Sequence, residues 1–89
     1  VPTIGTVVLS SAGRDQGRYF VVVELVDDED YVLIADGALR KIDRPKKKKL
    51  KHLIIKDVII PVVRERIEAK ERLYDYELRS HLEALGYNR

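Results

Sequence analysis

The residues best suited to bind a ligand are the cations between positions 40 and 52. This segment holds eight lysine or arginine residues and one acid, Asp43, whereas the whole chain has a net charge of +2. A concentrated cationic segment gains free energy by releasing counterions from a polyphosphate. The pattern predicts nucleic-acid contacts by Arg40, Lys41, Arg44, Lys46, Lys47, Lys48, Lys49, Lys51 and the adjacent His52. The alternative is a solvated loop that keeps the protein soluble or protects an edge strand.

A second group of cations lies in a glycine-rich segment near the start of the chain. Arg14 and Arg18 directly follow Gly13 and Gly17. Glycine lets the backbone turn tightly and approach a phosphate or sugar, and arginine presents a planar fork of donors. We therefore expect this loop to contact a nucleic acid; the alternative is an ordinary hairpin loop with solvated charges.

Two aromatic residues, Tyr19 and Phe20, follow the glycine-rich segment. If side chains alternate along the next strand with Val21, Val23 and Leu25 inward, Phe20 faces outward. Either ring could then stack on an unpaired base. The alternative is that these rings belong to the hydrophobic core.

Catalytic and metal-binding arrangements are not evident in the sequence. The two histidines, His52 and His81, lie in the basic segment and in the expected last helix, and neither is next to a nucleophile. Cysteine is absent, and the acidic run at residues 27–30 lacks the spacing and the glycine of a calcium loop. We expect a protein that is not an enzyme and that needs no metal or cofactor.

Length and composition limit the chain to one compact domain with a short extension. Of the 89 residues, 45% are hydrophobic, which is enough to form a core. No apolar run approaches the roughly 18 residues that cross a membrane. The absence of cysteine excludes disulfides and fits a reducing compartment. These features predict a cytoplasmic protein without membrane contact.

Residues 1–55 have the composition of a small β domain, because short apolar runs rich in valine and isoleucine alternate with turn signals. The pattern predicts strands at residues 5–10, 19–26, 31–35, 38–42 and 50–55. Asp36 and Gly37 predict a two-residue hairpin, and Pro45 is expected to end the fourth strand. Five short antiparallel strands favour a small, highly bent barrel, because an open sheet of this size leaves two edges unprotected.

Residues 56–89 form an expected helical extension. Pro61 is expected near a helix start, Asp75 as the cap of a second helix and Gly86 as its end, although one long helix also fits. Apolar residues at three- and four-residue spacing predict an amphipathic stripe made of Ile59, Val63, Ile67, Tyr74, Leu78, Leu82 and Leu85. This stripe either packs on the barrel or is covered by a second copy or another protein.

The order of these segments resembles a known RNA-binding family. Residues 7–23, with their strand, glycine loop and second apolar strand, resemble the KOW motif. With residues 31–37 and 44–53, the chain resembles the small bacterial KOW-domain RNA-binding proteins, which are akin to KOW-bearing large-subunit ribosomal proteins. The resemblance implies an SH3-like barrel that contacts structured RNA, ribosomal RNA above all, through residues 13–18 and 40–52. It also implies a helical tail, in which Glu71 stands where a turn-forming glycine is expected.

Two functional hypotheses follow from the sequence. The leading one is a ribosome-associated RNA-binding module with a role in translation, which presents its cations to RNA phosphates. The alternative is a protein-interaction adaptor that uses the barrel and the helical tail, because SH3-like barrels also bind polypeptides.

Overall fold

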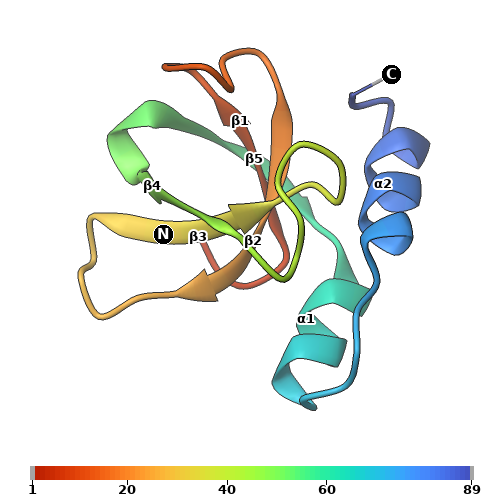
Figure 1. Cartoon of the computed structure of the whole chain (residues 1–89). Helices are drawn as coiled ribbons and strands as arrows, with labels where there is room; N and C mark the ends of the chain where they lie inside the picture. The colour runs from red at the N-terminus through yellow and green to blue at the C-terminus, as the bar shows by residue number, and fades with distance from the viewer. Residues whose placement is uncertain (1, 89) are drawn as a thin grey trace.

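A single antiparallel sheet of five strands makes up most of the chain, in a computed structural model that describes residues 2–88. The strands are β1 (Thr6–Ser10), β2 (Tyr19–Leu25), β3 (Tyr31–Ala35), β4 (Lys46–Lys49) and β5 (Leu53–Ile59). Their spatial order is β4-β3-β2-β1-β5 (Figure 1). The first four strands therefore follow one another as a meander, and β5 returns to pair with β1.

The sheet is strongly curled because its two edge strands are consecutive in the chain. Only the single 3₁₀ turn η1 (Leu50–His52) separates β4 from β5. The edges of a flat five-stranded sheet lie about 19 Å apart, at about 4.8 Å per strand, whereas three 3₁₀ residues advance about 6 Å. The mainly β class is therefore confirmed, but the sheet is open: within residues 2–88 no ladder joins β4 to β5.

The central strands are buried on both faces of the sheet. One cluster, which includes Val8, Phe20 and Ile34, fills the inside of the curl and draws residues from β1, β2, β3 and β5. The other face carries Val7 and Val21 and packs against the helices. Because both faces of β2 are covered, its side chains form a nearly continuous apolar run instead of the alternation of a strand with one solvated face.

Two short helices follow the sheet and lie on one side of it, with the second above the first in Figure 1. They are α1 (Pro61–Glu68) and α2 (Asp75–Ala84). Val63, Leu78 and Leu82 are each at most 1% exposed and share one cluster with Val7 and Val21 of the sheet. Part of the predicted stripe, with the half-buried Ile67, thus packs back onto the chain's own sheet. Its other members are 43–48% exposed: Ile59, Tyr74 and Leu85. Within residues 2–88, no helix has the length and hydropathy to span a membrane.

The ends of the helices explain why there are two and not one. Pro61 occupies the first turn of α1, as expected, because its fixed φ suits that position and its missing N–H is not needed there. Lys70 has a φ of 57°, and the N–H of Glu71 donates to the carbonyl of Arg66 at 2.8 Å. This left-handed turn ends α1 with a lysine one residue before the position where glycine was expected.

The predicted end of the second helix is correct, but the predicted cap is displaced by one residue. Gly86 has a φ of +87° directly after α2, and the N–H of Tyr87 donates to the carbonyl of Leu82 at 2.9 Å. These bonds form a Schellman motif, which requires a left-handed residue at that position. Asp75 is the first residue of α2 and Tyr74 is its N-cap. The Asp75 carboxylate instead accepts a bond from the Ile42 N–H at 2.8 Å.

Two predicted strands lie elsewhere in the structure. Residues 38–42 form part of a long loop instead of the fourth strand, and the lysine run after Pro45 is itself β4. The carboxylate of Asp36 accepts bonds from the N–H groups of Ala38 and Arg40, and this closes a wider turn than the predicted two-residue hairpin. The fifth strand begins at Leu53 and runs to Ile59, beyond the predicted boundary at residue 55.

Candidate nucleic-acid interface

The lysine run forms an edge strand whose side chains alternate between two faces. Ladder pairs join Lys46 to Ile34, Lys47 to Leu33, Lys48 to Val32 and Lys49 to Tyr31. Opposite residues of an antiparallel pair point to the same face. Lys46 and Lys48 therefore share the face of the buried Ile34 and Val32, and Lys47 and Lys49 lie on the outer face.

Lys48 is committed to the fold. It is 8% exposed, and its ammonium group donates to the carbonyl of Ala12 at 2.9 Å. A Cβ atom added to Gly13 would lie 3.4 Å from the Lys48 nitrogen. Lys48 thus ties the loop between β1 and β2 to the edge strand, and its prediction as an RNA contact is wrong because its charge is buried against a backbone carbonyl.

Lys47 and Lys49 gather around one aromatic ring. The ammonium nitrogen of Lys47 lies 4.7 Å from the centre of the Tyr31 ring, and that of Lys49 lies 5.7 Å from it. A cation over an aromatic face is attracted by the ring quadrupole, by about 0.5–1 kcal/mol at exposed sites. Tyr31 thereby holds two positive charges side by side at the edge of the sheet.

Sequence reasoning missed Tyr31 as part of the site. The alternation of apolar residues places it correctly at the start of β3, but only the register with β4 brings it against the lysines. That register was not predictable, because the fourth strand was expected at residues 38–42. A tyrosine that opens a strand next to a run of lysines in the following strand is the signal that could have identified it.

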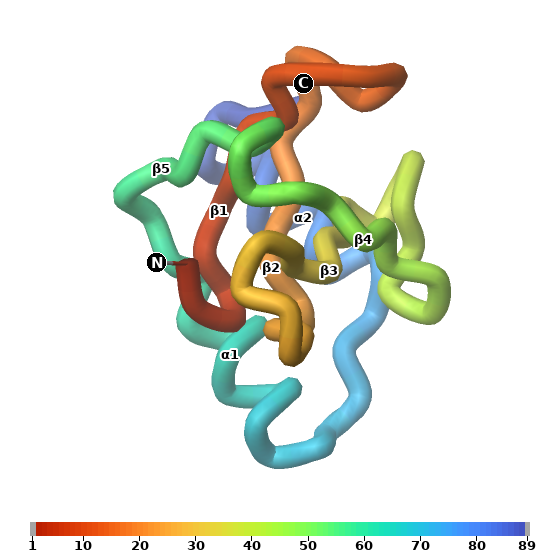
Figure 2. Tube along the Cα trace, turned by 90° about the vertical axis from the view of Figure 1, so that its left-hand side faces the viewer, coloured from red at the N-terminus to blue at the C-terminus, as the bar shows by residue number. Residues whose placement is uncertain are grey.

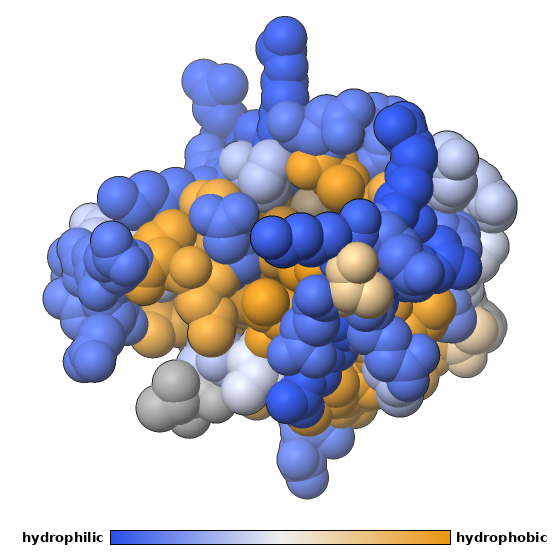
Figure 3. Space-filling model, turned by 90° about the horizontal axis from the view of Figure 1, so that it is seen from below, coloured by the Kyte–Doolittle hydropathy of each residue, from blue (hydrophilic) through white to orange (hydrophobic). Residues whose placement is uncertain are grey.

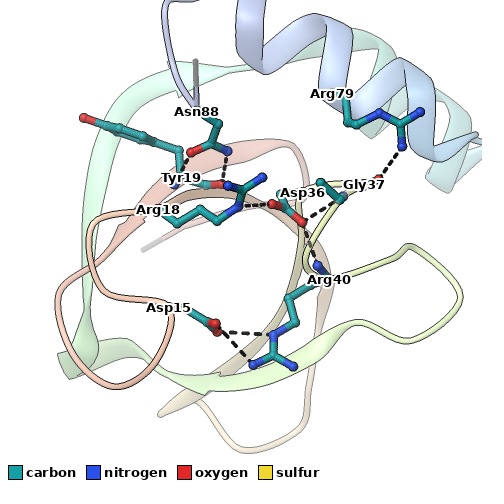
Figure 4. A network of polar contacts seen from close by, with 9 residues as sticks. Asp15, Arg18, Tyr19, Asp36, Gly37, Arg40, Arg79 and Asn88 are labelled. Atoms are coloured by element: carbon teal, nitrogen blue, oxygen red, sulfur yellow. Dashed lines mark hydrogen bonds and ion pairs between the residues drawn. The ribbon is translucent and has the colours of Figure 1, made fainter.

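Arg18 takes part in an ion-pair network within the protein itself, whereas a contact with an RNA phosphate was expected. Its guanidinium forms an ion pair with Asp36, whose side chain is fully buried (Figure 4). The same Asp36 carboxylate accepts the N–H of Arg40 at 2.7 Å. Arg18 thus compensates a buried charge, because a carboxylate removed from water must be paired.

Arg40 is also committed to the fold. Its Nε and Nη2 atoms donate to the two oxygens of Asp15 at 3.3 and 3.2 Å, and the Asp15 side chain is 1% exposed. In Figure 4 this pair bridges the loop between β1 and β2 and the loop between β3 and β4. Arg18 and Arg40 therefore each neutralise a buried carboxylate, and their expected contact with RNA phosphates stays a prediction.

Tyr19 packs against the end of the chain. Its ring stacks on Tyr87 with centroids 3.9 Å apart. The Asn88 amide accepts the Tyr19 N–H at 2.9 Å and donates to the Tyr19 carbonyl at 2.7 Å. Figure 2 shows the chain end beside the loop that joins β1 and β2. Tyr87 therefore covers one face of the Tyr19 ring.

Phe20 is a core residue. It is 0% exposed and lies in the cluster inside the curl of the sheet, so its prediction as a possible RNA contact is wrong and the core alternative is correct. The predicted inward set also fails at Leu25, which is 49% exposed after a register irregularity between Val22 and Glu24. This irregularity shifts the alternation of inward and outward side chains at the end of β2.

The glycine-rich loop has the predicted backbone conformation. Gly13 and Gly17 have φ values of +79° and +88°, which side-chain-bearing residues rarely adopt. Arg14 is exposed and, within residues 2–88, has no ion-pair partner. Of the two loop arginines, Arg14 is therefore the one whose charge no carboxylate of the described residues neutralises.

The remaining predicted cations form what we call the basic surface. Its members are six lysine or arginine residues that no carboxylate pairs within residues 2–88: Lys41, Arg44, Lys46, Lys47, Lys49 and Lys51. Lys46 and Lys49 are half-buried and the other four are exposed. His52 is half-buried in η1, and its carbonyl accepts the Ser11 N–H at 2.9 Å. The basic surface thus follows the β3–β4 loop, β4 and η1 along one edge of the sheet.

Two further features of the described residues concern metal binding and shifted pKa values. Within residues 2–88, no group of three or more His, Asp and Glu side chains could hold a metal ion. Shifted pKa values are found for Arg66 on α1 and Glu77 on α2, which form an ion pair between the helices. The pKa of Glu77 lies below its usual range because the Tyr74 N–H and the Arg66 guanidinium donate to its carboxylate. The hydrogen bond between the Arg66 guanidinium and the Glu77 carboxylate raises the pKa of Arg66.

Comparisons with known proteins add no relative. No protein-family model matches the chain, and a search of curated proteins returns no match.

Proposed function

We propose that this protein is a non-enzymatic RNA-binding module, and that its basic surface contacts structured RNA, ribosomal RNA being the expected class. The observation that carries the proposal is the composition of β4. An edge strand made of four lysines places Lys47 and Lys49 on one outer face, and no carboxylate of residues 2–88 neutralises them. Like charges at this spacing repel one another, and an anionic partner removes that repulsion.

The curled sheet supports the KOW resemblance as part of this proposal. The glycine-rich loop joins β1 to β2, which pair in register, and its glycines take left-handed conformations. The two edge strands follow each other in the chain through η1, as two strands of a small SH3-like barrel would. An SH3-like barrel and a relation to the KOW-type RNA-binding proteins are therefore part of this proposal.

The expected mode of contact is recognition of phosphates by shape. Six cations without a carboxylate partner among the described residues lie along one sheet edge, where we expect each to meet a phosphate of the RNA backbone. Phosphate contacts position a protein on a nucleic acid without reading its sequence. Arg14, which follows the Gly13 that lies over Lys48, adds a seventh cation near the end of the strand. The Tyr31 ring lies among these cations, and we expect it to meet an unpaired base in a loop or bulge.

The edge position of β4 also explains why lysines and not apolar residues form this strand. An unpaired edge invites pairing with other chains, and lysines are a common protection against it. Edge protection alone does not account for the neighbouring Lys41, Arg44 and Lys51, which lie outside the strand. The spread of cations beyond β4 favours a ligand over simple protection of the edge.

The test is binding of the purified chain to fluorescent structured ribosomal RNA fragments, with a single-stranded RNA as control, at several salt concentrations. Each phosphate met by a cation contributes about 0.7–0.9 to the slope of log affinity against log salt. We expect a slope of about −3 to −5 and tighter binding to the structured fragments. Absence of binding at low salt would overturn the proposal.

A further inference from the structure

A hollow lined mainly by apolar side chains lies beside the basic surface, at the start of β3, where Tyr31 and Leu50 line it. Its volume is 380 Å³, within the range of ligand pockets of about 300–1,000 Å³. Leu25 on its wall is 49% exposed, and Val26 and Leu50 are half-buried. Pro2, Val32 and Tyr31 complete the apolar lining. Figure 3, which views the molecule from below, shows hydrophobic surface on this side next to a hydrophilic cluster.

The rim of this hollow is acidic. Glu29 and Asp30 line it, and with Asp27 and Asp28 they form four consecutive carboxylates in the turn between β2 and β3. Within residues 2–88, none of the four is in an ion pair. The turn is fixed: the Tyr31 N–H donates to the Asp28 carbonyl at 3.0 Å, and the Leu50 N–H donates to the Asp30 carbonyl at 2.8 Å. The charges therefore stand in a defined place beside the apolar wall.

The charge of the rim decides what can occupy the hollow. The two rim carboxylates and their two neighbours in the turn repel the phosphates of RNA and attract cations, which is the opposite of Lys47 and Lys49 at the Tyr31 ring. The exposed Leu25 gains free energy only by burial against another apolar group. An occupant must therefore bring an apolar side chain and, along the same chain, more than one positive charge.

We propose that this hollow binds an extended polypeptide segment in which an apolar side chain is flanked by lysine or arginine. The apolar side chain lies between Leu25 and Leu50, and the flanking cations meet Glu29 and Asp30. The protein thus has two adjacent surfaces of opposite charge that share Tyr31: one for RNA and one for a basic protein segment. The hollow contains none of the six cations of the basic surface, so variants of Leu25, Glu29 and Asp30 test it separately from the RNA contact.

The experiment is an NMR titration of the ¹⁵N-labelled full chain with a short synthetic peptide. In this peptide one leucine is flanked by arginines, and serine fills the other positions. One control peptide replaces the leucine with serine, and a second replaces the arginines with glutamate. We expect the first peptide to shift the amides of Leu25, Val26, Tyr31 and Leu50, and both control peptides to leave them in place.

Matched variants locate the binding. Leu25→Ser removes the exposed apolar wall and should weaken binding about tenfold, whereas Leu39→Ser, at a leucine 53% exposed outside the hollow, should not. Glu29→Gln with Asp30→Asn should weaken binding and reduce its salt dependence. Its control, Glu65→Gln with Glu71→Gln, removes two exposed carboxylates on and after α1.

Three results would overturn the inference. The first is the absence of amide shifts at millimolar peptide. The second is equal binding of the serine control peptide, which would leave charge alone as the cause. The third is displacement of the peptide by structured RNA from the amides of the hollow, which would make the hollow part of an RNA site. A chain that binds the peptide but no RNA would retain this inference and lose the proposed function.

Discussion

Asp15 and Arg40 join two loops that lie far apart in the sequence. Both oxygens of the Asp15 carboxylate, which is 1% exposed, accept bonds from the Arg40 guanidinium at 3.2 and 3.3 Å. The neighbouring pair of Arg18 and Asp36 spans the same two loops. Arg18 and Arg40 thus hold the two loops in place, and the six cations of the basic surface are left to bind a ligand.

Replacement of Arg40 by alanine should therefore reduce stability and not RNA affinity. The change leaves Asp15 buried without its partner, and an unpaired buried charged group costs about 2 kcal/mol or more. Urea denaturation gives the free energy of unfolding, and RNA binding is measured at a temperature where the variant is folded.

The matched control for Arg40 is Arg14→Ala. Arg14 is exposed, so its removal should leave the free energy of unfolding within about 0.5 kcal/mol and weaken RNA binding. If Arg40→Ala were as stable as the wild type and bound RNA poorly, Arg40 would be an RNA contact and the structural role given to its ion pair would be wrong.

Two glycines with the same conformation should differ in their tolerance of alanine. Gly37 has a φ of +79°, and a Cβ there would lie 2.2 Å from the Asp75 carbonyl oxygen, so Gly37→Ala must displace α2. We expect a loss of roughly 3 kcal/mol or more. Gly17 has a φ of +88° with nothing within 4 Å, so Gly17→Ala should cost only the backbone strain of about 1 kcal/mol. Equal losses in thermal unfolding would contradict the close packing of α2 on the β3–β4 loop.

The helices should contribute directly to the stability of the sheet. Leu78 on α2 is 0% exposed in the cluster that contains Val7 and Val21 of the sheet, so Leu78→Ala should cost about 2–5 kcal/mol. Leu85→Ala, at a leucine that is 43% exposed, should cost well under half as much. If Leu78→Ala kept its stability as a monomer but lost an oligomer, the stripe would serve a partner and not the fold.

The contact between the helices should be sensitive to acid. The Glu77 carboxylate accepts bonds from the Tyr74 N–H and the Arg66 guanidinium, both at 2.9 Å, and its pKa is lowered from 4.5. A carboxylate with a lowered pKa stabilises the folded state above its unfolded pKa, and this contribution disappears as pH falls through the folded pKa. The difference in Tm between the wild type and Glu77→Gln should therefore be constant above about pH 5 and shrink below about pH 4. A difference that stays constant under strong acid would rule out this linkage.

Local patterns were sufficient to predict several elements of the fold. Residues 31–35 form the predicted third strand, and Gly86 ends the last helix because its left-handed conformation completes the hydrogen bonds there. Pro61 marks the start of α1 for an equally local reason. These predictions depend on backbone preferences within a few residues, which is the information that a single sequence carries.

The errors arise where tertiary contacts decide. The Asp36 carboxylate is neutralised by Arg18 and accepts bonds from nearby N–H groups, so the residues after it form a loop. The strand that pairs with β3 is therefore the later lysine run. Phe20 was difficult to place because β2 is covered on both faces. The cations of the candidate site were evident from the sequence. Which of them meet buried carboxylates was not evident, because that depends on contacts between distant loops.

The central claim is that RNA meets the outward lysines of β4, and one comparison tests it most directly. Lys47→Ala with Lys49→Ala removes two cations from the basic surface, and Lys56→Ala with Lys70→Gly removes two cations elsewhere. Glycine is chosen at Lys70 because the φ there is 57°. RNA affinity of both variants is measured against salt, and we expect the β4 variant to bind about tenfold or more weakly with a slope reduced by about 1.5, while the control binds like the wild type. Equal affinities and equal slopes for the two variants would contradict the account.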